Sequence, residues 1–283
     1  MAEIVAASSL LDDVRRISAR RNLDEAGVRL SLQAAEGGRV WLARDDGEAI
    51  GIVVAEDSED ERYVGDLFVE ESYRCHGIGA QLVAAAFVDA DDRGRAMLLD
   101  PRDSASIALA FWNRLAPRET VLRFAGAIPR EEELAKMAAG DYRFEVETID
   151  PAVHAGVLNE LDRQTRGTVR PGDHAQFALR ATGHAFALRG ECVGYAYVWP
   201  DGRVGPMAGS SEAYLVQLLA YALMTLQRRH SASWCTTLVP GSNRRIARAA
   251  LRAGLRIEQS LMFAADSFLG NMATYVGYHR LLL

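Results

Sequence analysis

The stretch that decides the fold is residues 63–83, which read YVGDLFVEESYRCHGIGAQLV. Its first seven residues are rich in β-branched and aromatic side chains, which predicts a strand over 63–69. The apolar run 82–88 predicts a helix, and the loop between them has the pattern Arg-x-x-Gly-x-Gly-Ala, from Arg74 to Ala80. The two glycines let main-chain N–H groups turn toward one point, where the partial positive charge of the helix N-terminus adds to them. The junction is therefore a predicted phosphate or pyrophosphate site, with the arginine as a supplementary cation.

The elements around this stretch predict an antiparallel meander that feeds the loop and its helix. Two helices come first, and after the loop the chain alternates between helices and strands. The strand at 95–99 follows a helix, so we expect it to run parallel to the strand at 63–69. The predicted elements of this half are helices at 8–21 and 24–35, strands at 39–43, 49–55 and 63–69, a helix from about 80, a strand at 95–99, a helix at 104–115, a strand at 120–125 and a helix at 131–139.

The chain starts again near Tyr142, because the same order of elements returns there. We therefore expect two domains, an N-terminal one at 1–142 and a C-terminal one at 143–283. The predicted elements of the second half are a strand at 143–149, helices at 150–162 and 175–180, a hairpin at 184–189 and 192–199, a strand at 203–208, a helix at 211–229, a strand at 232–239, a helix at 243–253 and strands at 255–264 and 273–282.

Composition excludes several classes of function. The chain has 283 residues, is 49% hydrophobic and 25% charged, and carries a net charge of −6. It has no apolar run of membrane-span length and no basic N-terminal region of a signal peptide, so we expect a cytoplasmic protein without a membrane partner. Three cysteines and six histidines show no disulfide or metal-ligand spacing, so no metal is expected. The first half is acidic and the second basic, which argues for two units and against a nucleic-acid partner.

The meander, the Arg-x-x-Gly-x-Gly/Ala loop and the strand and helix that follow resemble a GNAT-superfamily N-acetyltransferase. The sequence that carries the resemblance is 69–80, VEESYRCHGIGA, which has Glu71 where the family usually has a proline. The second half resembles a diverged second GNAT domain, as in tandem members, but its loop at 205–211 lacks the glycine pattern. The resemblance implies an α+β fold, an α/β/α sandwich. Each of two tandem GNAT-like domains then has a mixed, mostly antiparallel sheet flanked by helices.

The resemblance also implies an acetyl-CoA-dependent N-acetyltransferase. Its acetyl-CoA co-substrate is attacked directly by a primary amine of a small molecule or peptide. By resemblance to the family, the pantetheine arm is expected along the strand end and the pyrophosphate on the loop. The expected cofactor-binding residues are Leu67, Phe68, Val69, Arg74, Cys75, His76, Gly77, Ile78, Gly79 and Ala80. Asp66 is a candidate base, or alternatively a substrate contact or salt-bridge partner, with Glu61 and Glu70 behind it. Tyr73 is a candidate acid.

Departures from the family pattern leave alternatives open. Trp112 stands where the family has the tyrosine that usually acts as general acid, so a non-catalytic acyl-CoA-binding or regulatory protein is the second hypothesis. Phe111 and Trp112 are then expected to pack in the core or beside the cofactor. A dinucleotide loop fits Gly77 and Gly79, but the preceding meander and Leu82 at the third glycine position argue against it. The expected assembly is a monomer that folds as a pseudo-dimer, or a homodimer.

Overall fold

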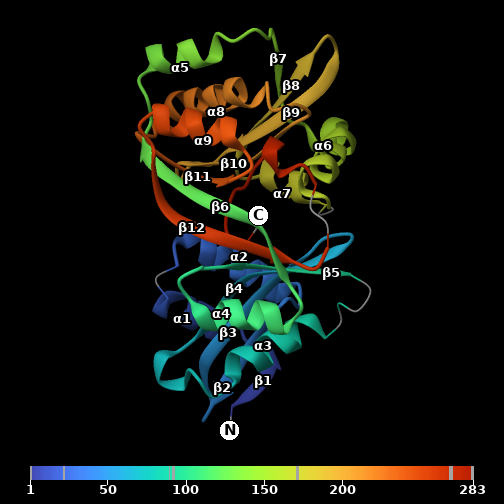
Figure 1. The fold of residues 1–283 in the computed structure, drawn as a ribbon, viewed down its shortest axis with the longest axis vertical. Coiled ribbons are helices and arrows are strands. Elements are labelled where there is room, and N and C mark those ends of the chain that lie inside the picture. The colour runs from blue at the N-terminus through green and yellow to red at the C-terminus, as the bar shows by residue number, and fades with distance from the viewer. Residues whose placement is uncertain are drawn as a thin grey trace. The chain divides into compact units, whose positions relative to one another are not determined.

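The structure is a computed structural model that describes residues 2–21, 23–88, 90, 93–169, 172–267 and 270–281 (Figure 1). It divides into two compact units. The first unit lies within residues 1–118, 262–267 and 280–282, and the second within 119–261, 268–279 and 283. Each unit takes segments from both predicted sequence domains, 1–142 and 143–283, whose functional assignment stays a prediction.

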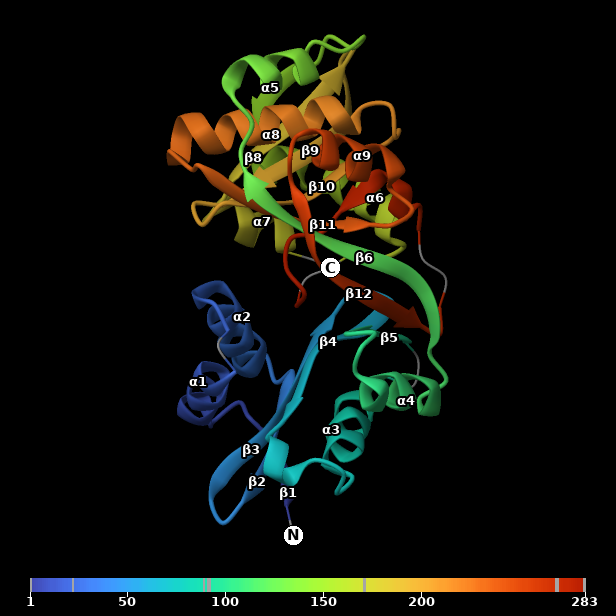
Figure 2. The same ribbon diagram turned by 60° about the vertical axis from the view of Figure 1, so that its left-hand side comes forward.

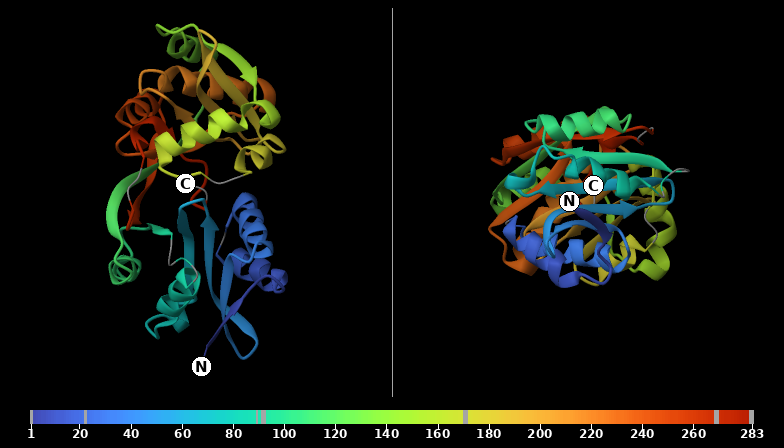
Figure 3. Two further views of the ribbon diagram at one scale, coloured as in Figure 1. Left: turned by 90° about the vertical axis from the view of Figure 1, so that its right-hand side faces the viewer. Right: turned by 90° about the horizontal axis from the view of Figure 1, so that it is seen from below.

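The first unit is a twisted sheet with helices on both faces. Figures 2 and 3 show α1 and α2 on one face and α3 on the other. Its elements are β1 (Glu3–Ala6), α1 (Leu11–Arg20), α2 (Glu25–Glu36), β2 (Val40–Asp45), β3 (Glu48–Asp57), β4 (Glu61–Val69), the 3-10 turn η1 (Glu71–Tyr73), α3 (Ile78–Phe87), β5 (Gly94–Leu99) and α4 (Ser104–Trp112).

The strands of the first unit run in the order β1-β2-β3-β4-β5, and among the residues that the structure describes only β4 and β5 of these pair in parallel. Alternate strand residues face α3, because side chains along a strand point to opposite faces. Val53 and Val64 from the strands therefore meet Leu82 and Ala86 from the helix in one buried cluster. This core fixes the helix whose N-terminus begins the predicted cofactor loop.

The strand beside β5 in the first unit comes from far along the sequence. Met262 pairs antiparallel with Leu99, and the ladder runs on to Ala265, which pairs with Ala96. These residues are the last four of β12 (Arg256–Ala265), whose first six belong to the second unit. The end of β12 therefore supplies the strand beside β5, and the strand predicted at 120–125 is not needed to complete this sheet.

The second unit repeats the plan, with strands in the order β12-β6-β11-β10-β9-β8-β7 and one parallel pair, β10 with β11. Its elements are β6 (Ala116–Ala127), α5 (Glu131–Ala138), β7 (Glu145–Thr148), α6 (Pro151–Arg166), α7 (Asp173–Ala178), β8 (Thr182–Leu188), β9 (Glu191–Val198), β10 (Arg203–Gly209), α8 (Leu215–His230), β11 (Trp234–Pro240), α9 (Arg244–Arg252), the start of β12, the 3-10 turn η2 (Met272–Thr274) and β13 (Tyr275–Val276).

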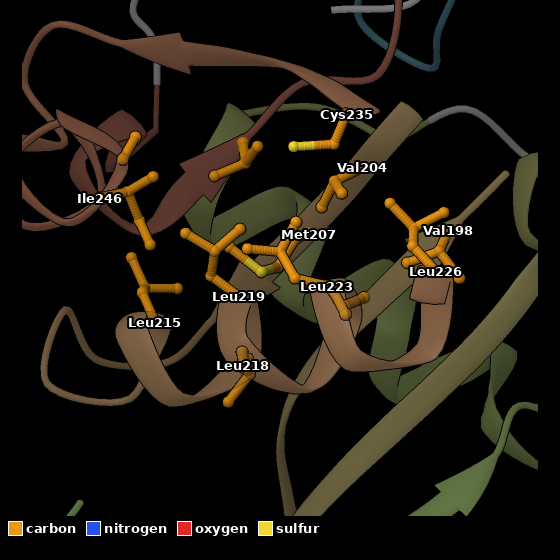
Figure 4. Close-up of a cluster of buried hydrophobic side chains, with 14 of the residues drawn as sticks. Val198, Val204, Met207, Leu215, Leu218, Leu219, Leu223, Leu226, Cys235 and Ile246 are labelled. Carbon is orange, nitrogen blue, oxygen red and sulfur yellow. The ribbon is translucent and has the colours of Figure 1, made fainter. Parts of the chain in front are cut away.

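The main core of the second unit lies between its strands and α8. Figure 4 shows Met207 of β10 beside Leu219 and Leu223 of α8, and Val198 of β9 beside Leu226. The neighbouring strand residues point to the other face, as the period of a strand requires. The mostly antiparallel sheets flanked by helices confirm the predicted fold class.

Several sequence predictions need correction. The first helix begins at Leu11 and has no side-chain cap, and the short strand β1 before it was not predicted. The predicted core position of Phe111 and Trp112 is wrong, because their side chains are 57% and 87% exposed. The predicted strand at 273–282 is only the two-residue β13, and residue 282 lies outside the described residues.

No helix among the described residues combines the length and the hydropathy that a membrane span requires.

Candidate functional site

The two parallel strands of the first unit stay paired only over their first halves. Their ladder runs from Glu61 opposite Gly94 to Val64 opposite Met97. At the next residue β4 bulges, because the partners of β3 pass from Val64 directly to Asp66 and leave Gly65 unmatched. Within the described residues, the rest of β4 therefore has no ladder partner on the β5 side.

The open edge of β4 exposes main-chain groups in a known direction. The N–H of Glu70 bonds to the carbonyl oxygen of Ile50 on β3, at 2.9 Å. Because successive residues of a strand alternate in direction, the main-chain groups of Leu67 and Val69 point away from β3, into the opening. The carbonyl oxygen of Val69 accepts a hydrogen bond from Nε of Arg74 there, at 3.0 Å. An extended ligand can pair with this edge as an added strand.

The loop that follows β4 turns through two left-handed residues, Cys75 with φ of 64° and Gly77 with φ of 78°. Glycine adopts this conformation without steric cost, and Gly77 is also the N-cap residue of α3. Among the residues that the structure describes, no protein acceptor lies within bonding distance of the N–H groups of 75–80. The first turn of a helix leaves such groups free for an anion.

The predicted cofactor residues of the loop are mostly accessible. Arg74, Cys75 and His76 are exposed, whereas Ile78 is buried in the core below. A Cβ on Gly79 would lie 3.5 Å from Leu109, which is ordinary contact. The structure thus places the loop directly after the open strand edge, and the predicted role of these residues in cofactor binding stays a prediction.

Asp66 is held by two arginines that the sequence did not connect with it. The carboxylate is 2% exposed and forms an ion pair with Arg21, which follows α1. Its other oxygen lies 3.5 Å from Nη2 of Arg280, and Nε of that arginine donates to the carbonyl oxygen of the bulge residue Gly65 at 3.2 Å. Burial, and then the charge of Arg280, lower the pKa of Arg21 to about 9. A carboxylate with a guanidinium on each oxygen is a positioned anion rather than a free proton acceptor.

Of the remaining candidates, Glu70 and Tyr73 lie just after the end of β4, whereas Glu61 lies at its start. Glu70 accepts a hydrogen bond from Arg20 at 2.7 Å, and Glu61 starts β4 at its opposite end. Tyr73 lies in η1 and packs half-buried against the core of the first unit. Trp112 ends α4 with its indole in solvent, so it fills neither the core nor the role of a tyrosine.

The equivalent opening of the second unit is filled by the chain itself. β10 and β11 pair in parallel only at Arg203 and Val204, and β13 then takes the place beside β10, with Val276 opposite Met207. The N–H of Gly277 donates to the carbonyl oxygen of Leu238 on β11, at 2.7 Å. The gap that stays open in the first unit is thus closed by a strand in the second.

A buried polar cluster lies on the face of the second unit's sheet opposite α8. Tyr195 donates to Asp162, whose other carboxylate oxygen lies 3.4 Å from Nε2 of His174 and 3.5 Å from Nη1 of Arg166. Tyr197 shares a 3.1 Å hydrogen bond with Nδ1 of the same histidine. Burial alone would raise the pKa of Asp162, but the histidine hydrogen bond and the arginine charge bring it below its ordinary value. Tyr195 and Tyr197 are therefore core residues.

Sequence reasoning missed the contacts that Arg21 and Arg280 make with Asp66 and the place that β13 takes beside β10. Each lies in a loop or short segment whose partner is remote in sequence, so periodicity carries no signal of it. In the sequence, a fully buried ion pair appears only as an isolated charged residue beside a predicted strand. Among the described residues, no group of His, Cys, Asp or Glu is arranged to hold a metal ion.

Comparison with known proteins identifies the domain that contains the loop. Residues 36–115 match the family model of the acetyltransferase (GNAT) domain, so this part of the chain is a GNAT domain. Solved structures resemble the fold of nearly the whole chain. A putative acetyltransferase from Pyrococcus horikoshii matches with a TM-score of 0.73 and 17% identity, over 97% of this chain and 92% of that one.

Two further solved structures share the fold. A tandem GNAT protein from the clavulanic acid biosynthesis pathway matches with a TM-score of 0.64 and 17% identity, over 94% of this chain and 98% of that one. A GCN5-related N-acetyltransferase from Sphaerobacter thermophilus matches with a TM-score of 0.63 and 14% identity, over 94% and 95%. The predicted resemblance to GNAT acetyltransferases is confirmed.

Proposed function

We propose that this chain, which carries a GNAT acetyltransferase domain, transfers an acetyl group from acetyl-CoA to a primary amine of a small molecule or peptide. The observation that carries the proposal is the surface formed by the N–H groups of 75–80 beside the open edge of β4. It lies within the 36–115 match to the acetyltransferase family, which supports acyl transfer in general. The acetyl donor and the amine acceptor are the finer part of the proposal.

The residues present fit an acyl-CoA. The loop offers main-chain donors and the cation Arg74 to a pyrophosphate, and the edge at Leu67 and Val69 offers strand-like pairing to an amide-containing arm. When bound, the co-substrate supplies a thioester carbonyl that an amine attacks, with the thiol as leaving group. The N–H near Val69 is then the donor that faces the charge developing on the carbonyl oxygen.

Asp66 and Tyr73 keep the roles of candidate base and acid as predictions. Each oxygen of Asp66 has lone pairs beyond those used by the arginines, so the carboxylate can still accept a hydrogen bond from an amine and orient it. Tyr73 has a phenolic hydroxyl just before the loop, whereas Trp112 has only an N–H donor. The proton steps are therefore best tested at these two residues.

We propose one acetyl-CoA per chain. The second unit has no glycine pattern at 205–211, and β13 occupies its strand opening. Its role is then structural. All three cysteines, Cys75, Cys192 and Cys235, are free thiols, which fits the reducing cytoplasm that we propose as the location.

The test is CoA release and binding stoichiometry on the full chain. Incubation with acetyl-CoA and a panel of primary amines is expected to release CoA, and calorimetry is expected to give one acetyl-CoA per chain. Tight binding without CoA release across a broad panel would favour the non-catalytic acyl-CoA-binding protein, which the exposed Trp112 motivates. A thermal shift with NAD(P) and none with acetyl-CoA would favour the dinucleotide alternative and end the acetyltransferase proposal.

A further inference from the structure

The charges at the split between β4 and β5 do not balance. Asp66 is one carboxylate between two guanidinium groups, those of Arg21 and Arg280. All three belong to the first unit. Asp100, directly after β5, also attracts Arg280, but Nη2 of Arg102 binds that carboxylate at 2.6 Å. Counting these five groups, one positive charge is left over beside the strand opening.

The excess charge has an unused donor. The side chain of Arg21 is 6% exposed, and its Nη1 is buried without a hydrogen-bond partner among the described residues. A buried donor without an acceptor costs free energy, all the more when it is charged. The guanidinium is fixed by Asp66 on one side and lies over the ring of Phe68, 5.3 Å from its centroid. An acceptor oxygen brought by a ligand would satisfy it.

Arg280 also contacts Asp66 and is partly exposed to solvent. Its side chain is 35% exposed, while its Nε and main-chain carbonyl are fixed by Gly65 and by the hydroxyl of Tyr63. A Cβ on Gly65 would lie 2.8 Å from the carbonyl oxygen of Arg280, so only glycine allows this close crossing. The arginine is thus a positioned, partly exposed cation that pairs with the same carboxylate as the buried Arg21.

We infer that Arg21 and Arg280 form an anion subsite for the acceptor, and that the amine acetylated by this chain also carries a carboxylate, as a free amino acid does. The inference rests on the proposed function. A guanidinium fork matches a carboxylate geometrically, and one excess positive charge matches a monoanion. Asp66 between the arginines repels a phosphate dianion and attracts the ammonium or amine of the same ligand. The α-amine and carboxylate of one amino acid are close enough together to meet these neighbouring groups.

The experiment compares amino acids with their amides, which differ by the anionic group. L-alanine, L-leucine and L-phenylalanine are each paired with the corresponding amide and titrated by calorimetry into the full chain loaded with CoA. In the unaltered protein, the acids are expected to bind about tenfold or more tightly than the amides, since a charged hydrogen bond contributes about 1.5–3 kcal/mol. Arg280→Met is expected to reduce that ratio below about threefold, and Arg280→Lys to retain part of it.

Arg95→Met is the matched control. Arg95 is 32% exposed and pairs with Asp266 at 3.0 Å, so its exposure and its single ion pair resemble those of Arg280. This variant is expected to keep the full acid-to-amide ratio. Equal affinities for acid and amide in the unaltered chain, no binding of any of the three acids, or an unchanged ratio in Arg280→Met would overturn the inference.

CoA release separates this inference from the proposed function. Acids that bind selectively but never release CoA from acetyl-CoA would leave the anion subsite standing and refute acetyl transfer to them. CoA release with amides at the same efficiency as with acids would support acetyl transfer and refute the carboxylate requirement.

Discussion

Replacing Asp66 by asparagine tests the charge arrangement on which the site depends. The substitution keeps the shape of the side chain and removes its charge. Arg21 and Arg280 would then face each other without the anion between them. We expect a large loss of stability in the first unit, because a buried cation without its partner is strongly unfavourable.

The size of the effect follows from burial. An exposed ion pair contributes about 0–1 kcal/mol, whereas removing one partner of a buried pair costs about 3–5 kcal/mol. The Asp66 side chain is 2% exposed and that of Arg21 is 6%, so the second range applies to this pair. The third partner, Arg280, is 35% exposed and can rehydrate in part. We therefore expect about 3–5 kcal/mol for Asp66→Asn and, once Arg21→Met is added, a smaller total loss than the sum of the two single variants.

Hydrogen exchange followed by mass spectrometry of peptides over 61–69 measures this stability locally, which avoids assuming that the two units unfold together. The cycle of Asp66→Asn, Arg21→Met and the double variant should give a coupling of about 2 kcal/mol or more. The partly exposed pair of Arg95 and Asp266 supplies the control cycle, with an expected coupling below about 1 kcal/mol. A loss under about 1 kcal/mol in Asp66→Asn, or additive single variants, would refute the reasoning.

Three further outcomes are expected. Gly79→Trp should abolish acetyl-CoA binding in calorimetry while Gly79→Ala, whose Cβ has room, keeps the fold; unchanged affinity in the tryptophan variant would count against the loop. Gly205→Ala should expose the amides of 275–278 to exchange, since its Cβ would collide with the carbonyl of Gly277; equal protection would show that β13 does not depend on this contact. The pKa of Asp162 is lowered in the folded state, so its contribution to stability is present above the unfolded pKa of about 4 and is lost as pH falls through the folded pKa. In urea denaturation, Asp162→Asn should therefore lower the stability of the second unit at pH 7 and make that stability depend less on acid pH. An acid midpoint that is the same in the variant and the unaltered chain would contradict this expectation.

The elements that the sequence predicted best are those with a strong local signal. The strand at 63–69 and the helix from Ile78 were found because β-branched residues, two glycines and an apolar run lie within a few residues of each other. The left-handed N-cap position of Gly77 can likewise be predicted from the local sequence, because only the local backbone conformation determines it. The strand, the glycine loop and the helix could therefore be predicted before any tertiary contact was known.

The two arginines around Asp66 could not be predicted in this way. Arg21 meets Asp66 across 45 residues and Arg280 meets it across most of the chain length, and nothing local distinguishes the two from the other arginines. The exposed Trp112 shows the reverse error, because an aromatic residue in an apolar helix was expected in the core. Burial of charge and exposure of apolar surface are both decided by tertiary neighbours, which a single sequence does not reveal.

The two strand openings share one cause and differ in what occupies them. The parallel pair of strands separates after four paired residues in the first unit and after two in the second. Each unit therefore has a strand edge whose main-chain groups need a hydrogen-bond partner. In the second unit Tyr275 and Val276 provide that partner permanently. In the first unit the corresponding edge stays open, and Arg280, four residues further along, binds Asp66 beside it instead. The first opening thus differs from the second in having no strand beside it among the described residues, and the C-terminal segment that closes the second opening continues to Arg280, the cation that pairs with Asp66.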